Sequence, residues 1–123
     1  MGTPEPDSAF AFETPLSPEA ISWARSFVAA IATASGADLE AAADVRLAVS
    51  EIVSTIVRHT PRERLEIDGR LDGDRLRLEI APWTRHVALD DEIDPWEVVE
   101  ALADDAMVRD GAAIITLPLL RSS

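Results

Sequence analysis

Hydrophobic residues recur at intervals of three and four between Asp44 and His59, which is typical of an amphipathic helix with one continuous apolar face. The remaining positions form a polar stripe on the opposite side of this helix, because successive residues turn by about 100°. A solvated outer surface or a functional site would both explain this stripe, and periodicity alone favours the solvated surface. The apolar positions are Val45, Ala48, Val49, Ile52, Val53, Ile56 and Val57, and the polar ones are Asp44, Glu51, Thr55 and Arg58, with His59 at the edge.

Two elements are predicted ahead of this helix. Residues 9–13 place two phenylalanines on one side of a short strand. Ser17-Pro18 has the residue types of an N-cap and a first helical position, and predicts a helix to about Ser35. Asp38 then caps the amphipathic helix, which should end before Pro61.

Strict alternation of apolar and charged residues predicts two further strands, over 64–71 and 76–80. The intervening Asp72-Gly73-Asp74 has the residue types of a tight turn. The two strands should therefore form an antiparallel hairpin with one face toward water.

The last part of the chain predicts a loop, a helix and a hairpin. Residues 81–94 have no clear period and indicate a loop. Asp94-Pro95 opens a short helix that should end near Asp105, and Asp110-Gly111 is the expected turn of a hairpin over 107–117.

The resulting order is strand, two helices, two strands, helix and two strands. It predicts a two-layer α+β sandwich, in which a mixed or antiparallel sheet carries helices on one face. The 123 residues fit a single domain over 9–123, preceded by a flexible tail over 1–8 that carries two prolines.

The formal net charge of −12 argues against binding of nucleic acid or an anionic membrane. It favours a basic or mixed-charge protein partner, although solubility alone would also explain it. Without cysteine there can be no disulfide, thiolate metal site or cysteine nucleophile. The first residues lack the pattern of a signal peptide and no apolar run is long enough to span a membrane, so a cytoplasmic location is expected.

The amphipathic helix that contains residues 44–59 resembles the N-box helix of the histidine-kinase-type (GHKL, Bergerat-fold) ATPases. It is most similar to the anti-sigma-factor serine kinase branch, where this helix commonly reads LAVSE-x-x-x-N-A-x-x-H. Leu47-Ala48-Val49-Ser50-Glu51 matches the start of that pattern and Arg58-His59 matches its end. The order of the flanking elements fits this branch as well. The resemblance implies a Bergerat-type sheet, and in active members a general base at the position of Glu51 and ATP with magnesium as cofactors.

Two residues depart from the nucleotide-binding pattern of that family. Thr55 stands where the family has the asparagine that holds magnesium, and a neutral hydroxyl would ligate this ion only weakly. Pro82 stands where the family has the aspartate of an Asp-x-Gly-x-Gly box, which accepts from the adenine amino group. Proline provides neither a side-chain acceptor nor an N–H, so the adenine anchor is absent.

A third departure concerns the phosphates. The family has a glycine-rich turn before its last helix, whereas this chain has no glycine between Gly73 and Gly111. Acidic residues occupy the corresponding segment and oppose an anion electrostatically, although acids before a helix also complement its dipole. A loose calcium or magnesium site is a further option for this run. These residues are Asp90, Asp91, Glu92 and Asp94.

These departures predict a pseudoenzyme that needs no cofactor and holds no metal. Glu51 would be a vestigial base, with Thr55, His59 and Pro82 as further remnants of the nucleotide site. His59 is expected to interact with the last carbonyls of its helix rather than to catalyse. His59 and His86 with nearby acids do not have the spacing of a zinc site.

The expected function is regulatory: the domain would sequester or scaffold a sigma factor or an anti-anti-sigma antagonist, with a homodimer as a secondary expectation from the family. Two tryptophans beside the acidic run are either core residues or part of an apolar contact surface. The candidates for partner contact are Trp83, Asp90, Asp91, Glu92 and Trp96.

Two other functions remain open from the sequence. One is an active ATP-dependent serine/threonine protein kinase with a divergent nucleotide pocket. The other is a ligand-binding domain that uses the vacated pocket, lined by Ile80 and Trp83, for a smaller and less anionic molecule.

Overall fold

The computed structural model describes residues 9–60, 63–83 and 94–121. The expected tail over 1–8 lies outside these residues, as do positions 84–93 of the expected loop. The elements in chain order are β1 (Ala9–Pro15), α1 (Pro18–Ala34), α2 (Leu39–His59), β2 (Arg64–Asp72), β3 (Arg75–Ala81), α3 (Pro95–Leu102), β4 (Asp105–Arg109) and β5 (Ala112–Pro118).

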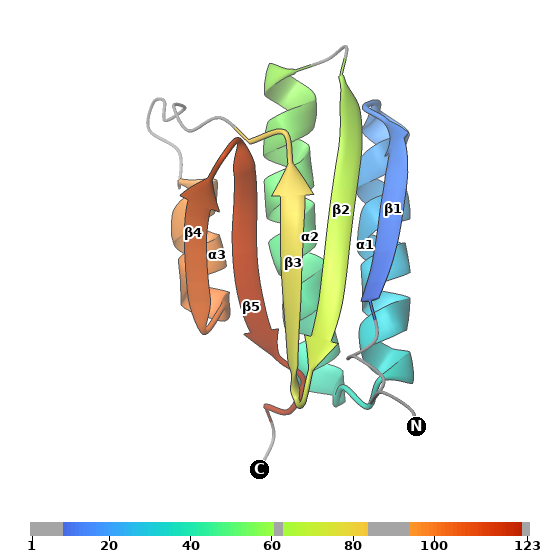
Figure 1. Cartoon of the computed structure of the whole chain (residues 1–123), viewed down its shortest axis with the longest axis vertical. Helices are drawn as coiled ribbons and strands as arrows, with labels where there is room; N and C mark the ends of the chain where they lie inside the picture. Colours follow the sequence, from blue (N-terminus) through green and yellow to red (C-terminus); the bar gives the residue numbers. More distant parts are fainter. Residues whose placement is uncertain (1–8, 61–62, 84–93, 122–123) are drawn as a thin grey trace, which may run out of the picture.

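The fold has two layers (Figure 1). One is a five-stranded sheet in the order β1-β2-β3-β5-β4, and all four strand pairings are antiparallel. The other consists of α1, α2 and α3, which lie together on one face of the sheet, with α2 between the other two. The predicted α+β sandwich is confirmed, and of the two sheet types considered it is the antiparallel one.

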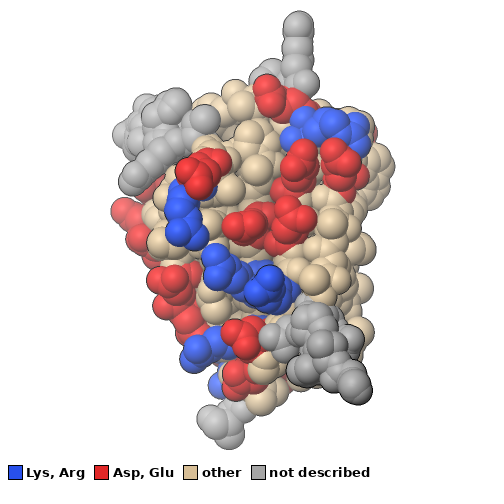
Figure 2. Space-filling view, viewed as in Figure 1, with Lys and Arg blue, Asp and Glu red and all other residues tan. Residues whose placement is uncertain are grey.

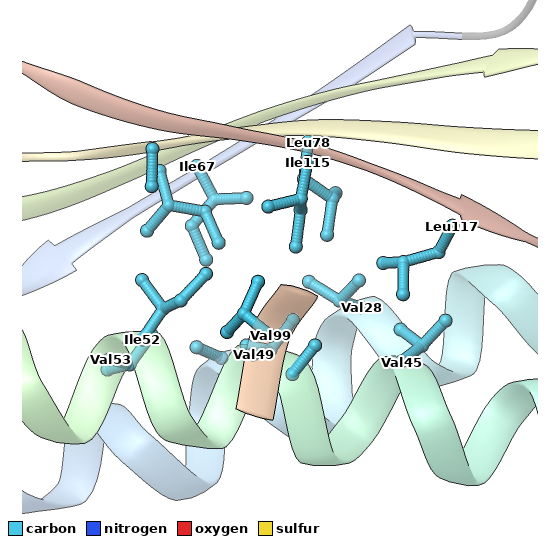
Figure 3. Packing of buried hydrophobic residues seen from close by; sticks show 14 of the residues in the cluster. Val28, Val45, Val49, Ile52, Val53, Ile67, Leu78, Val99, Ile115 and Leu117 are labelled. Atoms are coloured by element: carbon cyan, nitrogen blue, oxygen red, sulfur yellow. The ribbon is translucent and has the colours of Figure 1, made fainter. Parts of the chain in front are cut away.

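The core fills the space between the two layers (Figure 3). The apolar face of α2 supplies Val49, Ile52 and Val53, which are fully buried beneath the sheet. The sheet supplies the inward-facing members of its alternating strands, such as Ile67 and Leu78. The period of 3.6 in the helix and the period of 2 in the strands therefore bring two apolar faces together, as the sequence predicts.

Element boundaries follow the sequence signals closely. The Asp38 carboxylate caps α2 by accepting from the Ala41 amide at 2.9 Å, and Gly36 adopts a φ of +100° after α1. Ser17 occupies the N-cap position of α1, but its side chain makes no capping hydrogen bond.

Two predicted boundaries need correction. The first strand continues to Pro15, because its pairing with β2 extends to Arg64. The third helix ends at Leu102 rather than near Asp105, since Asp105 already pairs with β5 as the first residue of β4. In both cases strand pairing decides the boundary: β1 pairs with β2, which is distant in sequence, whereas β4 pairs with its hairpin neighbour β5.

No helix in the described part of the chain has the length and apolar character needed to cross a membrane.

Candidate functional site

A small cleft lies where the C-terminal turn of α2 meets the end of β3. Its volume is about 10 Å³, which is about the space of one water molecule. It is lined by Thr55, Ile56, His59, Thr60, Pro82 and Trp83. Three residues predicted as remnants of a nucleotide site (Thr55, His59 and Pro82) thus come together around one cleft.

Thr55 is buried, with 4% of its surface exposed. The solvated polar stripe predicted for α2 is therefore wrong at this position, because α2 is flanked by neighbouring helices and Trp83 lies beside the same cleft. The Thr55 Oγ1 donates a hydrogen bond to the Glu51 backbone oxygen at 2.8 Å, a bond within the helix. Its proton is thus engaged within the helix.

Glu51 and His59 lie at different distances from the cleft. Glu51 is half-buried one turn before Thr55, and its side chain is not among those that line the cleft. His59 is the exposed last residue of α2 and lines the cleft. It makes no side-chain hydrogen bond within the described residues, so its expected interaction with the last carbonyls is at most one of charge with the helix dipole.

Trp83 closes the cleft from the sheet side. Only 7% of its surface is exposed, and its backbone N–H donates to the Gly111 oxygen at 2.8 Å. Its indole ring packs against that of Trp96, with ring centroids 5.4 Å apart and planes inclined at 39°. The buried indole nitrogen finds no hydrogen-bond partner among the residues described. Of the two roles predicted for this residue, the structure supports the core role.

The Trp96 side chain is more exposed to solvent than that of Trp83. It is half-buried on the first turn of α3, and its indole N–H donates to Glu100 Oε2 at 3.0 Å. Asp94 caps this helix by accepting from the Trp96 amide at 3.0 Å, so this acid has the dipole-complementing role that the sequence allows. Asp90, Asp91, Glu92 and His86 lie outside the described residues. Within the described ranges, no three His, Asp or Glu side chains are grouped as metal ligands.

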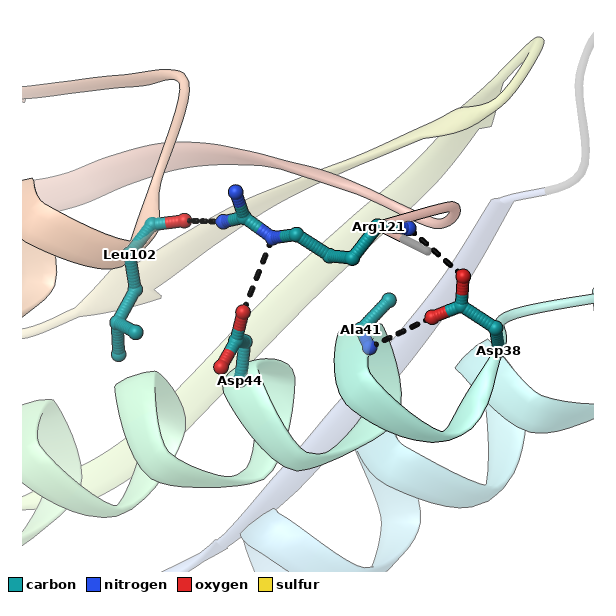
Figure 4. A network of polar contacts seen from close by, with 5 residues as sticks. All are labelled: Asp38, Ala41, Asp44, Leu102 and Arg121. Carbon is teal, nitrogen blue, oxygen red and sulfur yellow. Dashed lines mark hydrogen bonds and ion pairs between the residues drawn. The ribbon is translucent and has the colours of Figure 1, made fainter. Parts of the chain in front are cut away.

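A second polar cluster, which the sequence does not predict, lies at the other end of α2 (Figure 4). Arg121 forms an ion pair with Asp44 at 3.0 Å through its Nε atom, and its guanidinium also donates to the Leu102 carbonyl at the end of α3. The Arg121 amide donates to Asp38 Oδ2 at 2.8 Å. These contacts join the C-terminal segment to α2 and α3. No local pattern signals them, because the partners are far apart in sequence.

Comparisons with known proteins give the following matches. A family model described as a histidine kinase-like ATPase domain matches residues 14–111. Among solved structures, the crystal structure of the RsbU and RsbW domains of Rv1364c from Mycobacterium tuberculosis is similar, with a TM-score of 0.67 and 22% sequence identity. The alignment covers 89% of this chain and 31% of that one, so the present chain spans about a third of that protein. At this identity the likeness concerns the fold. No curated protein matches the chain.

Proposed function

The chain belongs to the histidine kinase-like ATPase family, whose model covers residues 14–111, and on this basis we propose that it is a regulatory protein-binding domain with a degenerate nucleotide site. In this proposal the domain acts like an anti-sigma factor. It sequesters or scaffolds a protein such as a sigma factor or an anti-anti-sigma antagonist in the cytoplasm, without a cofactor.

The observation that carries the proposal is the closed cleft between α2 and the end of β3. Pockets for small molecules and cofactors usually have volumes of about 300–1,000 Å³. The cleft beside Thr55 and Pro82 has about 10 Å³, because Trp83 is packed into the core at this point. Within the described residues, this cleft is far too small to hold a nucleotide.

The chemistry of the lining residues supports the same conclusion. Thr55 stands in place of the magnesium-binding asparagine, and its hydroxyl donates to the Glu51 carbonyl. Pro82, in place of the adenine-binding aspartate, brings no acceptor in its side chain. A retained Glu51 without a bound phosphoryl donor has no reaction to assist.

Calorimetric titration with ATP and magnesium tests the absence of nucleotide binding. We expect no binding heat from the unmodified chain at ATP concentrations up to about 1 mM, an affinity limit of about −4 kcal/mol. Thr55→Val is the matched variant, since it keeps the volume of the side chain and removes its oxygen. It should behave identically and change the free energy of unfolding by no more than about 1 kcal/mol.

The opposite result would support the alternative function, an active serine/threonine kinase with a divergent pocket. The retained, half-buried Glu51 on α2 is the feature that favours this alternative. Micromolar binding of ATP that is lost in Glu51→Ala and in Thr55→Val would refute the degenerate site.

Capture of partners from the native extract tests the binding function. Trp96 keeps a half-buried aromatic surface next to the closed cleft, and we expect Trp96→Ala to lower recovery of the specific partner about tenfold or more. Trp23→Ala is the matched control, because it removes a side chain of the same type that is exposed on α1, a different helix. Equal recovery of the partner with both variants would show that Trp96 is not part of the contact surface. Recovery of no specific protein would contradict the regulatory function.

A further inference from the structure

The sheet ends at β1, and no described element pairs with the outer side of this strand. β1 is the first strand in the order β1-β2-β3-β5-β4, and it lies at the right-hand margin of the sheet in front of α1 (Figure 1). An unpaired edge presents a row of backbone N–H and C=O groups that can pair with another extended segment. The residues of β1 and their neighbours therefore indicate what this edge can bind.

The hydrogen-bond pattern between β1 and β2 decides which backbone groups of β1 are free. The Leu16 amide donates to the Glu63 oxygen at 3.0 Å, which continues the antiparallel ladder by one residue pair. Hydrogen-bonded pairs alternate along such a ladder, so the even-numbered residues of β1 bond to β2. The N–H and C=O groups of Ala9, Ala11 and Glu13 point away from the sheet, and they find no partner among the described residues.

β1 also lacks the features that usually protect a sheet edge. Natural edge strands carry charged side chains, prolines or bulges that discourage a further strand. At the other edge, β4 has only five residues, with the charged Asp105 and Arg109 at its ends. β1 has seven residues, and its single charge and single proline, Glu13 and Pro15, lie toward its end. The first part of β1 is thus open to an additional strand.

An aromatic ledge lies beside this edge on the helical side of the sheet. It consists of Phe10, Phe12 and Phe27, each of which keeps part of its surface exposed. The Phe27 ring from α1 stacks on that of Phe12 with centroids 4.9 Å apart, and it meets that of Phe10 edge-on at 5.7 Å. A Cβ on Gly69 would lie 2.0 Å from the Phe10 ring, so the absence of a side chain there seats this ring against β2. The ledge can therefore pack against apolar side chains of an added strand.

On the other side, the open face of the sheet carries acidic and basic side chains (Figure 2). Each β1 residue with free backbone groups is opposite a charged residue of β2: Glu13 is opposite Glu66, Ala11 is opposite Asp68, and Ala9 is opposite Arg70. Glu13 also pairs with Arg64 at 3.0 Å, which leaves one net negative charge beside it. From Glu13 to Ala9, the charges nearest the edge are therefore negative, negative and positive.

The remaining charges near this part of the sheet do not alter that order. Glu79 and Arg77 on β3 are directly opposite Asp68 and Arg70 and repeat their signs. Asp72 lies two residues past Arg70, where the described pairing of β2 with β1 ends. Asp105 belongs to β4 at the other edge of the sheet. A segment beside β1 therefore meets the same three signs in the same order.

Two small side chains make these charges accessible from the edge. Ala9 and Ala11 are alanines, and a hollow of about 400 Å³ lies beside Ala9 and the charges of β2 and β3. A residue of an added strand opposite Ala11 would be two strand spacings, about 10 Å, from Asp68. A lysine there can extend over the alanine toward the carboxylate. In the same way Arg70 can extend over Ala9 toward a carboxylate on the added strand.

We propose that the β1 edge binds an extended segment of a partner protein by strand addition. The added strand runs antiparallel to β1, as every strand pair in this sheet does. Its inward side chains are apolar and pack on the aromatic ledge. Its outward side chains, from the N-terminus, are a cation opposite Glu13, a cation opposite Ala11 and an anion opposite Ala9. Backbone hydrogen bonds supply affinity in such complexes, and the alternating side chains supply specificity.

This surface is separate from the one proposed around Trp96. β1 is at one edge of the sheet, whereas α3 lies beside β4 at the other (Figure 1). Loss of binding at one surface therefore leaves the other intact, and the two proposals can fail independently. A segment that carries more cations than anions also agrees with the net charge of −12.

Fluorescence anisotropy with labelled, end-capped peptides at about 0.15 M salt tests the proposal. The matched peptide is Val-Lys-Val-Lys-Val-Glu, which places its valines on the ledge and its charges in the complementary order. The control Val-Lys-Val-Glu-Val-Lys has the same composition and net charge, but it mismatches two of the three positions in either strand direction. We expect the control to bind at least tenfold more weakly. Equal binding of the two peptides would overturn the proposal.

Methylation of peptide amides tests whether binding uses the backbone of the edge. In the proposed register the lysines and the glutamate donate their N–H groups to β1, whereas the valine N–H groups point away. Methylation of the two lysine amides should therefore lower the affinity at least tenfold. Methylation of the second and third valine amides adds the same number of methyl groups and should change it less than threefold. An equal loss in both methylated peptides would contradict strand addition.

Ala11→Pro tests the same edge from the side of the protein. The N–H that this change removes points away from the sheet, so the pairing of β1 with β2 should be retained. The far-ultraviolet circular dichroism spectrum should match that of the parent, while binding of the matched peptide falls at least tenfold. A parent chain that binds no matched peptide at about 1 mM, whether its edge is free or occupied by a second copy, would refute the proposal.

Arg70→Glu tests the register without a change in the backbone. The parent peptide is compared with Val-Lys-Val-Lys-Val-Lys, and the ratio of the two affinities should move at least tenfold toward the lysine peptide in this variant. Arg25→Glu makes the same change of net charge on α1 and should leave the ratio as it is in the parent chain. An equal shift in both variants would show that Arg70 does not face the end of the bound peptide, and the assigned register would be wrong.

Discussion

Replacement of Trp83 by alanine is expected to lower the free energy of unfolding by about 3–5 kcal/mol, the usual cost of removing a large buried aromatic side chain. Trp83 is 93% buried, since 7% of its surface is exposed, and it packs against Trp96 and the end of α2. Its removal leaves a void at the cleft that rigid strands on one side cannot fill. Urea denaturation monitored by circular dichroism measures this change.

Two comparison variants make the Trp83 result specific. Trp23→Ala removes a residue of the same type that is 51% exposed, and should cost less than about 1 kcal/mol. Trp83→Phe should cost clearly less than Trp83→Ala, because the indole N–H lost in this change has no partner among the described residues. If Trp83→Ala cost no more than Trp23→Ala, the side chain would not close the cleft in solution.

Replacement of Arg121 by alanine is expected to lower the free energy of unfolding by about 1–3 kcal/mol. This residue pairs with Asp44 on α2 and donates to the Leu102 carbonyl on α3, and both charged side chains are mostly buried, at 27% and 23% exposure. Its loss leaves the Asp44 carboxylate without its ion-pair partner and detaches the C-terminal segment from α3. Thermal denaturation should show a lower midpoint.

The control for Arg121 is Arg75→Ala. Arg75 pairs with Asp104 at 3.4 Å, but these side chains are 57% and 40% exposed, so solvent screens the pair and its loss should cost less than about 0.5 kcal/mol. A double-mutant cycle of Arg121→Ala with Asp44→Asn should show that the two changes are not additive. Additive effects, or an Arg121→Ala variant as stable as Arg75→Ala, would contradict the structural role assigned to this contact.

The family match relates the predicted motif to the observed cleft. The opening of the N-box pattern and its histidine are retained in α2, and the helix has the position expected for this fold. Thr55, His59 and Pro82 meet at one cleft although Pro82 is distant from the helix in sequence. The resemblance could anticipate this meeting, because it supplied the tertiary arrangement that periodicity lacks. Whether these residues still serve a nucleotide is a prediction that titration must test.

The sequence by itself determined the elements and their order. The apolar period of α2, the alternation of β2 and β3, the Asp38 cap and the glycine turns are local features, and local sterics and patterning are enough to specify them. The apolar faces so defined can be buried together only in two layers, so the class of fold follows as well.

The tertiary structure alone decided which polar residues of α2 are buried and which charges become neighbours. Thr55 is buried because Trp83 and the flanking helices enclose that side of α2, and Arg121 reaches Asp44 because the last strand ends beside the start of α2. Asp68 and Glu79 become neighbours, as do Arg70 and Arg77, only through the register of β2 with β3. Each feature depends on a contact between distant segments, whose free energy comes from global packing and is not written in any local pattern.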